Sequence, residues 1–265
     1  MRRFLIALQF LTIFPIKISA EGARLPDGQG FAFGEKSGIK ERDFGGALSY
    51  FPVVGLLISA ALILILSAFN FLPYPVKIIL VLIGSIIITG AMHLDGFADT
   101  CDGFSAGKSK EEILEVMRDP HIGTAGVAAV VSIILLKFTL MAAIPDGILW
   151  KSLLMMVVFG RWSQVLACYG SRYARENGKA KSFVEYATLK ELAISGIITI
   201  LVFLLLGKWK GFFLFLSVSI AAYLSIHYLK KKIAGVTGDT IGAVNEISEI
   251  WVLLFMLISS RVSLW

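Results

Sequence analysis

Residues 123–145 read Gly-Thr-Ala-Gly-Val-Ala-Ala-Val-Val-Ser-Ile-Ile-Leu-Leu-Lys-Phe-Thr-Leu-Met-Ala-Ala-Ile-Pro, a run with a single charged residue and the length of a helix that crosses a bilayer. Similar apolar runs recur at about 47–72, 76–92, 150–170, 190–207, 211–229 and 240–260. The chain of 265 residues is 57% hydrophobic and 17% charged, with a mean hydropathy of +0.79, which exceeds what a soluble core requires. We therefore predict an all-α, polytopic membrane helix bundle of about seven transmembrane helices.

The N-terminal end starts with Met1-Arg2-Arg3 and an apolar stretch up to Phe14-Pro15, but it lacks the small-residue cleavage site of a signal peptide. We expect a retained, interfacial helix there. The Gly-rich, charged segment from Ser19 to Gly46 is predicted to be a loop ordered against the membrane body. No internal repeat is evident, so residues 1–265 are predicted to form a single integral membrane domain.

The connections between apolar runs alternate between short and long. The short ones are 73–75, 145–150 and 207–211, and the long ones are the N-terminal segment, 93–122, 171–189 and 230–239. Most Lys and Arg residues lie in the long connections, so the positive-inside rule predicts that these loops are cytoplasmic in a cell (inner) membrane. The net charge of +6 then reflects an anionic membrane face, and no nucleic-acid partner is expected.

A carboxylate cluster follows the second apolar run, in His93-Leu-Asp95-Gly-Phe-Ala-Asp99-Thr-Cys-Asp102-Gly103. Positions i, i+4 and i+7 share one face of a helix, where like charges repel. A hard divalent cation would turn that repulsion into coordination, and Mg²⁺ also binds substrate phosphates. We predict Asp95, Asp99 and Asp102 as metal ligands; a solvated helix end and an ion or proton relay of a transporter are the alternatives.

Two further segments carry polar groups that suit the same site. Arg118-Asp119-Pro-His121-Ile-Gly123-Thr124-Ala-Gly126 offers a cation, an imidazole and Gly-rich backbone that would cradle a phosphate, or it is an ordinary loop. Asp239 to Glu249 carries Asn245, Glu246 and Glu249 into the last apolar run, as further metal or substrate ligands or as a purely structural helix contact.

Two cations lie inside apolar runs. Arg161 is expected to face the interior of the bundle, toward acids or phosphates, whereas Lys137 would snorkel or pair locally. The two cysteines, Cys101 and Cys168, form no C-x-x-C pair, so neither a disulfide framework nor a cysteine-rich zinc site is indicated.

The sequence resembles the adenosylcobinamide-GDP ribazoletransferase family, also called cobalamin 5'-phosphate synthases, over nearly its whole length. Three blocks carry the resemblance: Phe10-Leu-Thr-Ile-Phe-Pro15, the acidic cluster with Met117-Arg118-Asp119 and Ile122-Gly123-Thr124, and Thr237-Gly238-Asp239 through Glu246 to Glu249. Where the family pattern has an Arg after Leu-Thr this chain has Ile13, so no substrate role is assigned to that position.

The resemblance implies attack of an α-ribazole (or α-ribazole 5'-phosphate) hydroxyl on the phosphoanhydride of adenosylcobinamide-GDP, with release of GMP. It implies catalytic roles for Asp95, Asp99 and Asp102, one of them as base, and secondary metal or substrate contacts for Glu246 and Glu249. The remaining substrate-binding candidates are Arg118, His121, Arg161, Asp239 and Asn245. The bilayer and these two substrates are the expected partners, and a homo-oligomer stays open.

Two other functions compete with this one. Asp99-x-x-Asp102-Gly103-x-x-Ala106 matches the opening of the CDP-alcohol phosphotransferase motif of phospholipid synthesis, but Gly107 replaces its Arg and the rest is absent. An ion-coupled transporter would need broken helices at mid-membrane and inverted repeats, whereas the acids here lie at the ends of runs.

Overall fold

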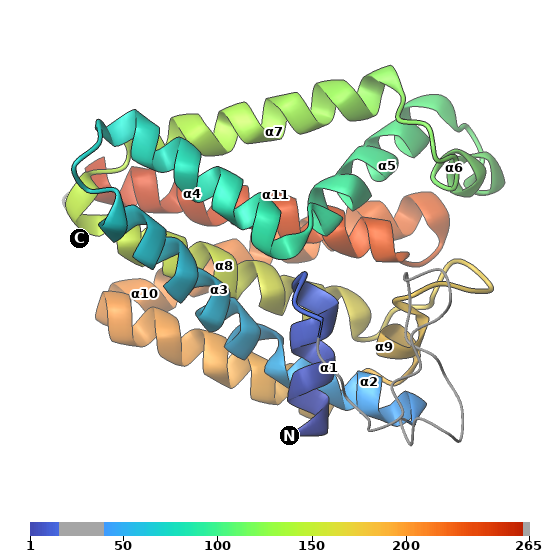
Figure 1. The fold of residues 1–265 in the computed structure, drawn as a ribbon. Coiled ribbons are helices and arrows are strands. Elements are labelled where there is room, and N and C mark those ends of the chain that lie inside the picture. Colours follow the sequence, from blue (N-terminus) through green and yellow to red (C-terminus); the bar gives the residue numbers. More distant parts are fainter. Residues whose placement is uncertain (16–39, 262–265) are drawn as a thin grey trace.

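The computed structural model describes residues 1–15 and 40–261, and within these ranges the regular structure is helical apart from one isolated parallel bridge between Tyr173 and Val236. The predicted all-α class is thus confirmed (Figure 1). The helices are α1 (Arg2–Leu11), α2 (Glu41–Ala47), the 3-10 turn η1 (Leu48–Tyr50), α3 (Phe51–Ala68), α4 (Tyr74–Thr89), α5 (Met92–Ala106), α6 (Lys110–Val116), α7 (Thr124–Ala143), α8 (Asp146–Cys168), α9 (Lys181–Glu185), α10 (Leu189–Ile233) and α11 (Gly238–Arg261).

Several of these helices could cross a membrane. Within the described residues, 4 helical stretches are long and apolar enough, namely Glu41–Ala68, Thr124–Ala143, Leu189–Ile233 and Gly238–Arg261. The count rises to 5 if α4 and α5, which are bent by 87° at their junction, form one broken span. This supports a polytopic membrane protein, although the predicted number of seven spans is not confirmed.

Helix α10 corresponds to two of the predicted apolar runs. Lys208 interrupts it with a backbone at φ 52° and ψ −137°, and the chain reverses there (Figure 1). The rings of Phe203 and Phe215 lie 5.7 Å apart, which a straight helix would not allow for residues three turns apart. A side chain at Gly211 would collide with the carbonyl oxygen of Phe203, so glycine permits this close approach. The runs 190–207 and 211–229 are therefore two arms of one helical hairpin.

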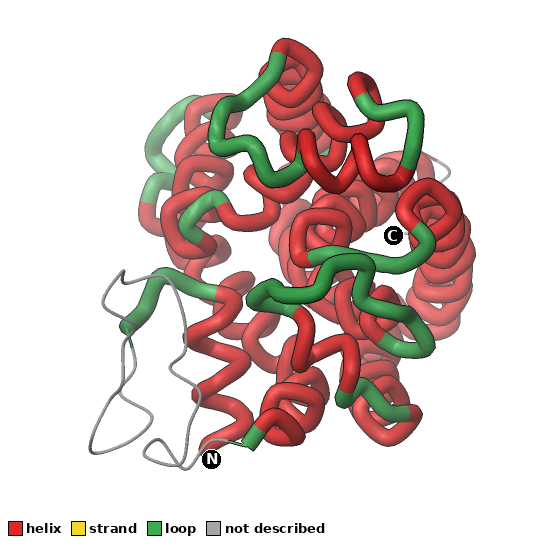
Figure 2. Tube along the Cα trace, turned by 90° about the vertical axis from the view of Figure 1, so that its right-hand side faces the viewer, coloured by secondary structure: helices red, strands yellow, loops and turns green. Residues whose placement is uncertain are grey.

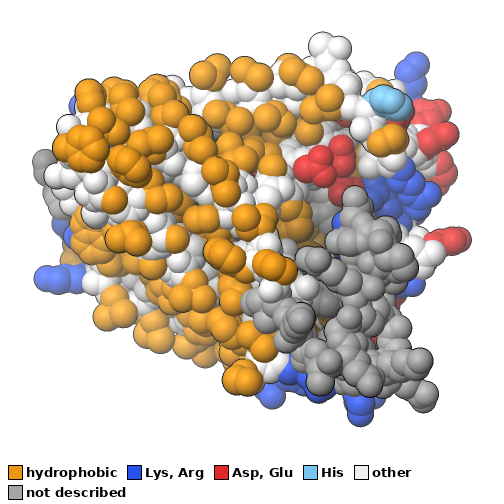
Figure 3. Space-filling model, in the orientation of Figure 1, with side chains coloured by type: hydrophobic (Ala, Val, Ile, Leu, Met, Phe, Trp, Pro, Cys, Tyr) orange, Lys and Arg blue, Asp and Glu red, His pale blue; other side chains and the backbone are white. Residues whose placement is uncertain are grey.

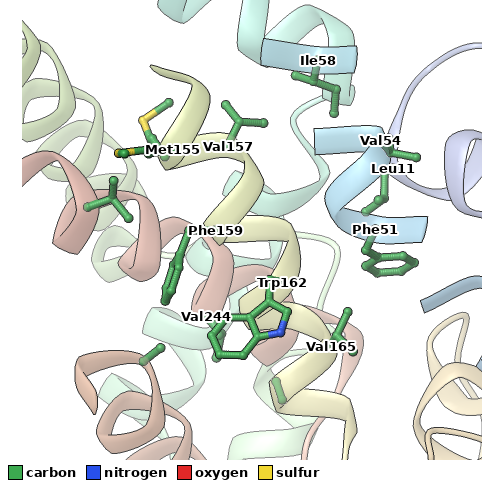
Figure 4. Packing of buried hydrophobic residues seen from close by; sticks show 14 of the residues in the cluster. Leu11, Phe51, Val54, Ile58, Met155, Val157, Phe159, Trp162, Val165 and Val244 are labelled. Atoms are coloured by element: carbon green, nitrogen blue, oxygen red, sulfur yellow. The ribbon is translucent and has the colours of Figure 1, made fainter. Parts of the chain in front are cut away.

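Helix α8 lies at the centre of the bundle. It packs against α3, α10 and α11, and it buries side chains around its whole circumference. Figure 4 shows its Phe159 and Trp162 among apolar residues of the neighbouring helices. In a bilayer such contacts stabilise the bundle through close van der Waals packing. The hydrophobic effect adds little there, because lipid tails are as apolar as the core. Gly55 of α3 illustrates this, since a Cβ there would come within 3.0 Å of Val158 Cα.

Charged residues and loops gather at one end of the bundle. Figure 3 shows an apolar surface over most of the visible face and charged side chains at the right-hand end, and Figure 2 shows the loops that cover this end. The turns between α3 and α4 and between α7 and α8 lie at the opposite end (Figure 1). Of the loop predicted over 19–46, residues 19–39 lie outside the described ranges. Residues 41–47 form helix α2 with Phe44 buried, so that part of the prediction was wrong.

The bend between α4 and α5 brings the acidic cluster to this charged end. Helix α4 ends at Gly90, whose φ of 61° is followed by a φ of 58° at Ala91. Two successive left-handed residues stop the helix and redirect the chain, a conformation that glycine adopts at low cost. Helix α5 therefore leaves the direction of α4 and lies across α11, which it contacts closely.

Candidate functional site

The three acids of the cluster lie on one continuous helix. Helix α5 runs without a break from Met92 to Ala106, so Asp95, Asp99 and Asp102 share one side of it as their spacing predicts. Asp95 is exposed, and the other two are partly buried. The carboxylate of Asp99 interacts electrostatically with those of Asp239, Asp95 and Asp102, and with the guanidinium of Arg175. The cluster is thus strongly anionic and includes an acid from α11.

Asp102 holds the start of helix α7. Its carboxylate accepts hydrogen bonds from the backbone N–H groups of Gly123 at 2.8 Å and Gly126 at 2.7 Å. A negative charge at a helix N-terminus is stabilised by the helix dipole and by the unpaired N–H groups. The Gly-rich turn that the sequence suggested as a phosphate cradle thus presents two of its N–H groups to a carboxylate of the chain itself.

Arg118 and His121 are exposed and lie in the segment between α6 and α7. The Asp119 carboxylate accepts a 2.9 Å hydrogen bond from the backbone N–H of His121 and lies 2.7 Å from its Nδ1. These hydrogen bonds lower the pKa of Asp119 below its ordinary value. The His121 side chain is 89% exposed, so this segment forms part of the surface and does not line the cavity described next.

A cavity of about 330 Å³ lies between α5, α8, α11 and the chain around α9. Asp95 and Asp239 line it together with His93 and Gln164. Its other lining residues are Phe10, Phe51, Met92, Cys168, Tyr173, Arg175, Gly178, Lys179, Ala180, Phe183, Gly238, Ile241 and Gly242. The cavity therefore combines an acidic, a basic and an aromatic part, and we call it the acidic cavity.

Arg175 is the cation closest to the acids. Its Nη1 lies 2.7 Å from Oδ2 of Asp239, and its Nη2 donates to the carbonyl oxygen of Met117 at 3.2 Å. Its Nε is buried and has no hydrogen-bond partner within the described chain. Arg175 and Tyr173 also line a second cavity of about 530 Å³. We call it the basic cavity, because Lys110, Arg172, Arg175 and Lys181 outnumber its two acids, Glu176 and Glu185. Burial raises the pKa of Tyr173 at this shared border.

Glu246 and Glu249 of α11 lie deeper in the bundle and are paired with cations. Nζ of Lys137 lies 2.7 Å from Oε2 of Glu246 and 2.5 Å from Oε2 of Glu249. Nη1 of Arg161 lies 3.2 Å from Oε1 of Glu249 and also donates to Asn245. Arg161 is 1% exposed, as expected for a side chain directed into the bundle interior. These four charged groups form a neutral cluster, the buried ion cluster.

A hydrogen-bonded chain links the buried ion cluster to the acidic cavity. Nε2 of Gln164 donates to Oδ1 of Asn245 at 3.1 Å and lies 2.8 Å from Nε2 of His93. Both His93 and Gln164 line the cavity and are almost completely buried. Polar groups inside an apolar bundle require such partners, because each unpaired one is costly.

The described residues contain no group of three or more His, Cys, Asp or Glu side chains that could hold a metal ion by themselves. Glu246 and Glu249 already accept hydrogen bonds from Lys137. Asp95 and Asp99 are one turn apart, and no ion pair to either occurs within the described chain. Two carboxylates suit Mg²⁺, which proteins commonly hold with one or two carboxylates while substrate phosphates and water complete the coordination. The assignment of metal ligands stays a prediction.

Several residues of this site were not singled out from the sequence. Arg175 and Lys179 belong to a basic connection in which nothing distinguishes one cation from another. Phe183 is far from the acidic cluster in the sequence, so no local spacing indicates that the two lie near one cavity. His93 was part of the quoted motif but carried no assigned role, although its position two residues before Asp95 was the available signal.

The fold and the site together define a polytopic, all-α membrane protein with a carboxylate-lined cavity at the charged end of its bundle. Residues 3–257 match the model of the family described as cobalamin-5-phosphate synthase, and the chain belongs to that family. The adenosylcobinamide-GDP ribazoletransferase of Clostridium acetobutylicum is 37% identical over 258 residues, covering 96% of this chain and 94% of that protein. The protein of the same name from Acetivibrio thermocellus is 36% identical over 256 residues, covering 96% of each. No solved structure matches the chain.

Proposed function

We propose that this chain joins α-ribazole, or its 5'-phosphate, to adenosylcobinamide-GDP, releasing GMP and forming adenosylcobalamin or its 5'-phosphate. The observation that carries this proposal is its similarity, over nearly the whole chain, to relatives that bear the name adenosylcobinamide-GDP ribazoletransferase. The site supports it chemically, because acids and an arginine meet at the border of two cavities, as a reaction between two substrates requires.

The reaction exchanges one phosphorus–oxygen bond for another. An α-ribazole hydroxyl oxygen bonds to the phosphorus nearest the cobinamide, and the bond from that phosphorus to the bridging oxygen breaks. GMP leaves with the electron pair of that bond, and the hydroxyl proton passes to Asp95, the acid of α5 that lines the acidic cavity. Arg175 contacts the diphosphate, and its ion pair with Asp239 fixes its planar fork in place.

Asp95 and Asp99 would hold Mg²⁺ together with the diphosphate oxygens. When bound, the ion neutralises the charge that develops on the leaving phosphate. A carboxylate has two oxygens, so Asp95 could help to hold the ion and still accept the proton. In this proposal Asp102 organises the start of α7, and Glu246 and Glu249 hold the bundle interior, because their oxygens are already hydrogen-bonded.

The reactive end of the bundle is assigned to the cytoplasmic side of the cell (inner) membrane. Arg172, Arg175, Lys179 and Lys181 lie in the connection that contains α9, which is at this end of the bundle (Figure 1), as the positive-inside rule requires of a cytoplasmic loop. The donor carries a charged diphosphate and the acceptor a hydroxyl-rich ribose, which suits a site that opens to an aqueous compartment. No nucleic-acid partner is required, and assembly into a homo-oligomer stays open.

Release of GMP by the purified protein in lipid nanodiscs tests the proposal. With adenosylcobinamide-GDP, α-ribazole and magnesium we expect acceptor-dependent GMP release and a corrinoid product, both lost on chelation. Asp99→Asn should lower turnover at least about a hundredfold, because one of the two carboxylates that would hold Mg²⁺ at the reacting diphosphate is lost. Glu111→Gln, which removes an exposed carboxylate on α6, is the matched control and should keep full turnover.

Either of two results would contradict the proposal. Full turnover by Asp99→Asn would exclude the metal assignment. A folded protein without acceptor-dependent GMP release would exclude the reaction, and assays with CDP-alcohol substrates would follow, because Asp99-x-x-Asp102-Gly103 matches the opening of that motif.

A further inference from the structure

One wall of the acidic cavity is built from three phenylalanine rings. Phe10 comes from α1, Phe51 from the start of α3 and Phe183 from α9, and all three line the cavity. The ring centroids of Phe10 and Phe183 are 4.4 Å apart, those of Phe51 and Phe183 are 5.6 Å apart, and those of Phe10 and Phe51 are 6.1 Å apart. Residues far apart in the sequence thus form one aromatic cluster, which we call the aromatic wall. Phe51 and Phe183 are each 1% exposed, so the partly buried Phe10 presents most of the open ring surface of this cluster.

The same cavity also has polar lining residues. Asp95, Asp239 and Arg175 line it, and they are the groups assigned above to the reacting atoms. A molecule that fills this space would therefore hold one flat, apolar end against the rings and a hydroxyl-bearing end against the carboxylates. A nucleoside has this division, with an aromatic base at one end and a ribose at the other.

The size of the cavity indicates which of the two substrates it can hold. Its volume of about 330 Å³ lies at the lower end of the roughly 300–1,000 Å³ typical of small-molecule sites. A nucleoside fits such a space, whereas a corrinoid carrying a nucleoside diphosphate is several times larger. The adjoining basic cavity of about 530 Å³ contains Lys110 and Arg172, whose charges suit a diphosphate, whereas its Lys181 lies 3.8 Å from Glu185. Arg175 lines both cavities and marks the border at which the two substrates would meet.

The chemistry of the aromatic wall also distinguishes between bases. The three phenylalanines offer no hydrogen-bonding group, so a guanine placed against them would leave its amine and carbonyl groups unpaired at a cost. The benzimidazole of α-ribazole has an apolar edge and needs no such partners there. Stacking on aromatic side chains is available to any flat base.

We propose that the acidic cavity is the binding site for the acceptor nucleoside, with its aromatic base on Phe10, which Phe51 and Phe183 hold in place, and its ribose hydroxyls toward Asp95 and Asp239. The inference rests on the proposed function for the identity of the acceptor. It adds the location of the acceptor, the residues that recognise its base, and the separation of the acceptor from the donor nucleotide.

Phe10 is the member of the wall to change, because it is partly buried whereas Phe51 and Phe183 are each 1% exposed. We expect Phe10→Leu to raise both the Kd for α-ribazole and its KM about tenfold, within the range of one lost stacking contact. The kcat and the KM for adenosylcobinamide-GDP should stay within about twofold of the wild-type values. Phe10→Tyr keeps an aromatic ring and should bind α-ribazole as the wild-type protein does. Phe44→Leu is the matched control, since Phe44 lies edge-on to Phe183 at 5.3 Å but does not line the cavity.

Calorimetric titration of α-ribazole into the full-length protein in nanodiscs, alongside the kinetic assay, separates the outcomes. Failure of the wild-type protein to bind α-ribazole, or an unchanged Kd and KM in Phe10→Leu, would overturn the proposal. A raised KM for adenosylcobinamide-GDP instead would place the donor's guanosine on the wall and overturn it as well. If α-ribazole binds and Phe10→Leu weakens this binding while no GMP is ever released, the site stands and only the proposed reaction fails.

Discussion

Replacing Lys137 with methionine should destabilise the protein strongly, because Lys137 balances two buried acids. Its Nζ contacts Glu246 and Glu249, and all three side chains are at most 8% exposed. Arg161 then remains as the single cation of the buried ion cluster, and one negative charge is left uncompensated inside an apolar bundle. Breaking a buried ion pair in this way costs about 3–5 kcal/mol, which corresponds to a fall in Tm of roughly 6–20 °C for a chain of this size.

The double variant Lys137→Met/Glu246→Gln isolates the charge effect from the packing effect. It removes one charge of each sign and leaves the contact between Arg161 and Glu249, so the cluster is neutral again. We expect it to recover at least half of the stability that Lys137→Met loses, since a neutral amide is far less costly to bury than an unpaired carboxylate. Glu246→Gln alone completes the cycle and should also destabilise, because it leaves an excess positive charge.

Thermal unfolding in nanodiscs, followed by tryptophan fluorescence at one protein concentration, measures these differences. Lys190→Met, at an exposed position of α10, is the control for loss of a lysine and should shift Tm by little. Loss of a buried ion pair should lower the Tm by at least roughly 6 °C. The reasoning is refuted if the Tm of Lys137→Met lies within about 3 °C of that of the wild type. A double variant less stable than Lys137→Met would refute it too, since charge balance would then not govern the cluster.

Three other predictions follow from close contacts at the site. Gly96→Ala should lower both Tm and turnover, because the added Cβ would lie 2.8 Å from the backbone of Asp239 and overpacking costs about 1–3 kcal/mol. Gly147→Ala is the control and should change neither, because a Cβ there would have no neighbouring atom within 4 Å. Asp102→Ala should lower the free energy of unfolding by about 0.5–2 kcal/mol, measured by thermal unfolding, and Asp102→Asn should lower it less. If Asp102→Asn is stable but has no turnover, Asp102 is instead a metal ligand. Arg175→Lys should lower kcat/KM for adenosylcobinamide-GDP at least about tenfold through loss of the planar fork, and unchanged kinetics would exclude the phosphate contact.

Hydropathy predicted the helices well because it depends on local composition. The runs 123–145 and 240–260 correspond to α7 and α11 with small shifts at their ends. The short connection predicted at 207–211 is the reversal at Lys208, where the backbone of a single residue leaves the helical conformation. The number of membrane crossings depends on such details, so composition alone does not determine it.

The roles of acidic residues were harder to predict, because a carboxylate's role depends on its partners. Spacing placed Asp95, Asp99 and Asp102 on one face of a helix, as the structure has them. It did not show that Asp102 would meet the N–H groups of Gly123 and Gly126, which lie on the other side of α6 in the chain. The same holds for Glu246 and Glu249, whose cations come from α7 and α8.

Helix α11 joins the membrane interior to the reactive end, and its two polar regions depend on one another. Asp239 at its start lines the acidic cavity, and Glu249, nearly three turns further on, lies in the buried ion cluster. A buried charge has few alternative partners in an apolar bundle, so the contacts of Glu249 with Lys137 and Arg161 restrict the rotation of α11 about its axis. That rotation determines whether Asp239 faces the cavity and Arg175. The buried ion cluster therefore acts on the site by orienting the helix, although none of its members lines the cavity.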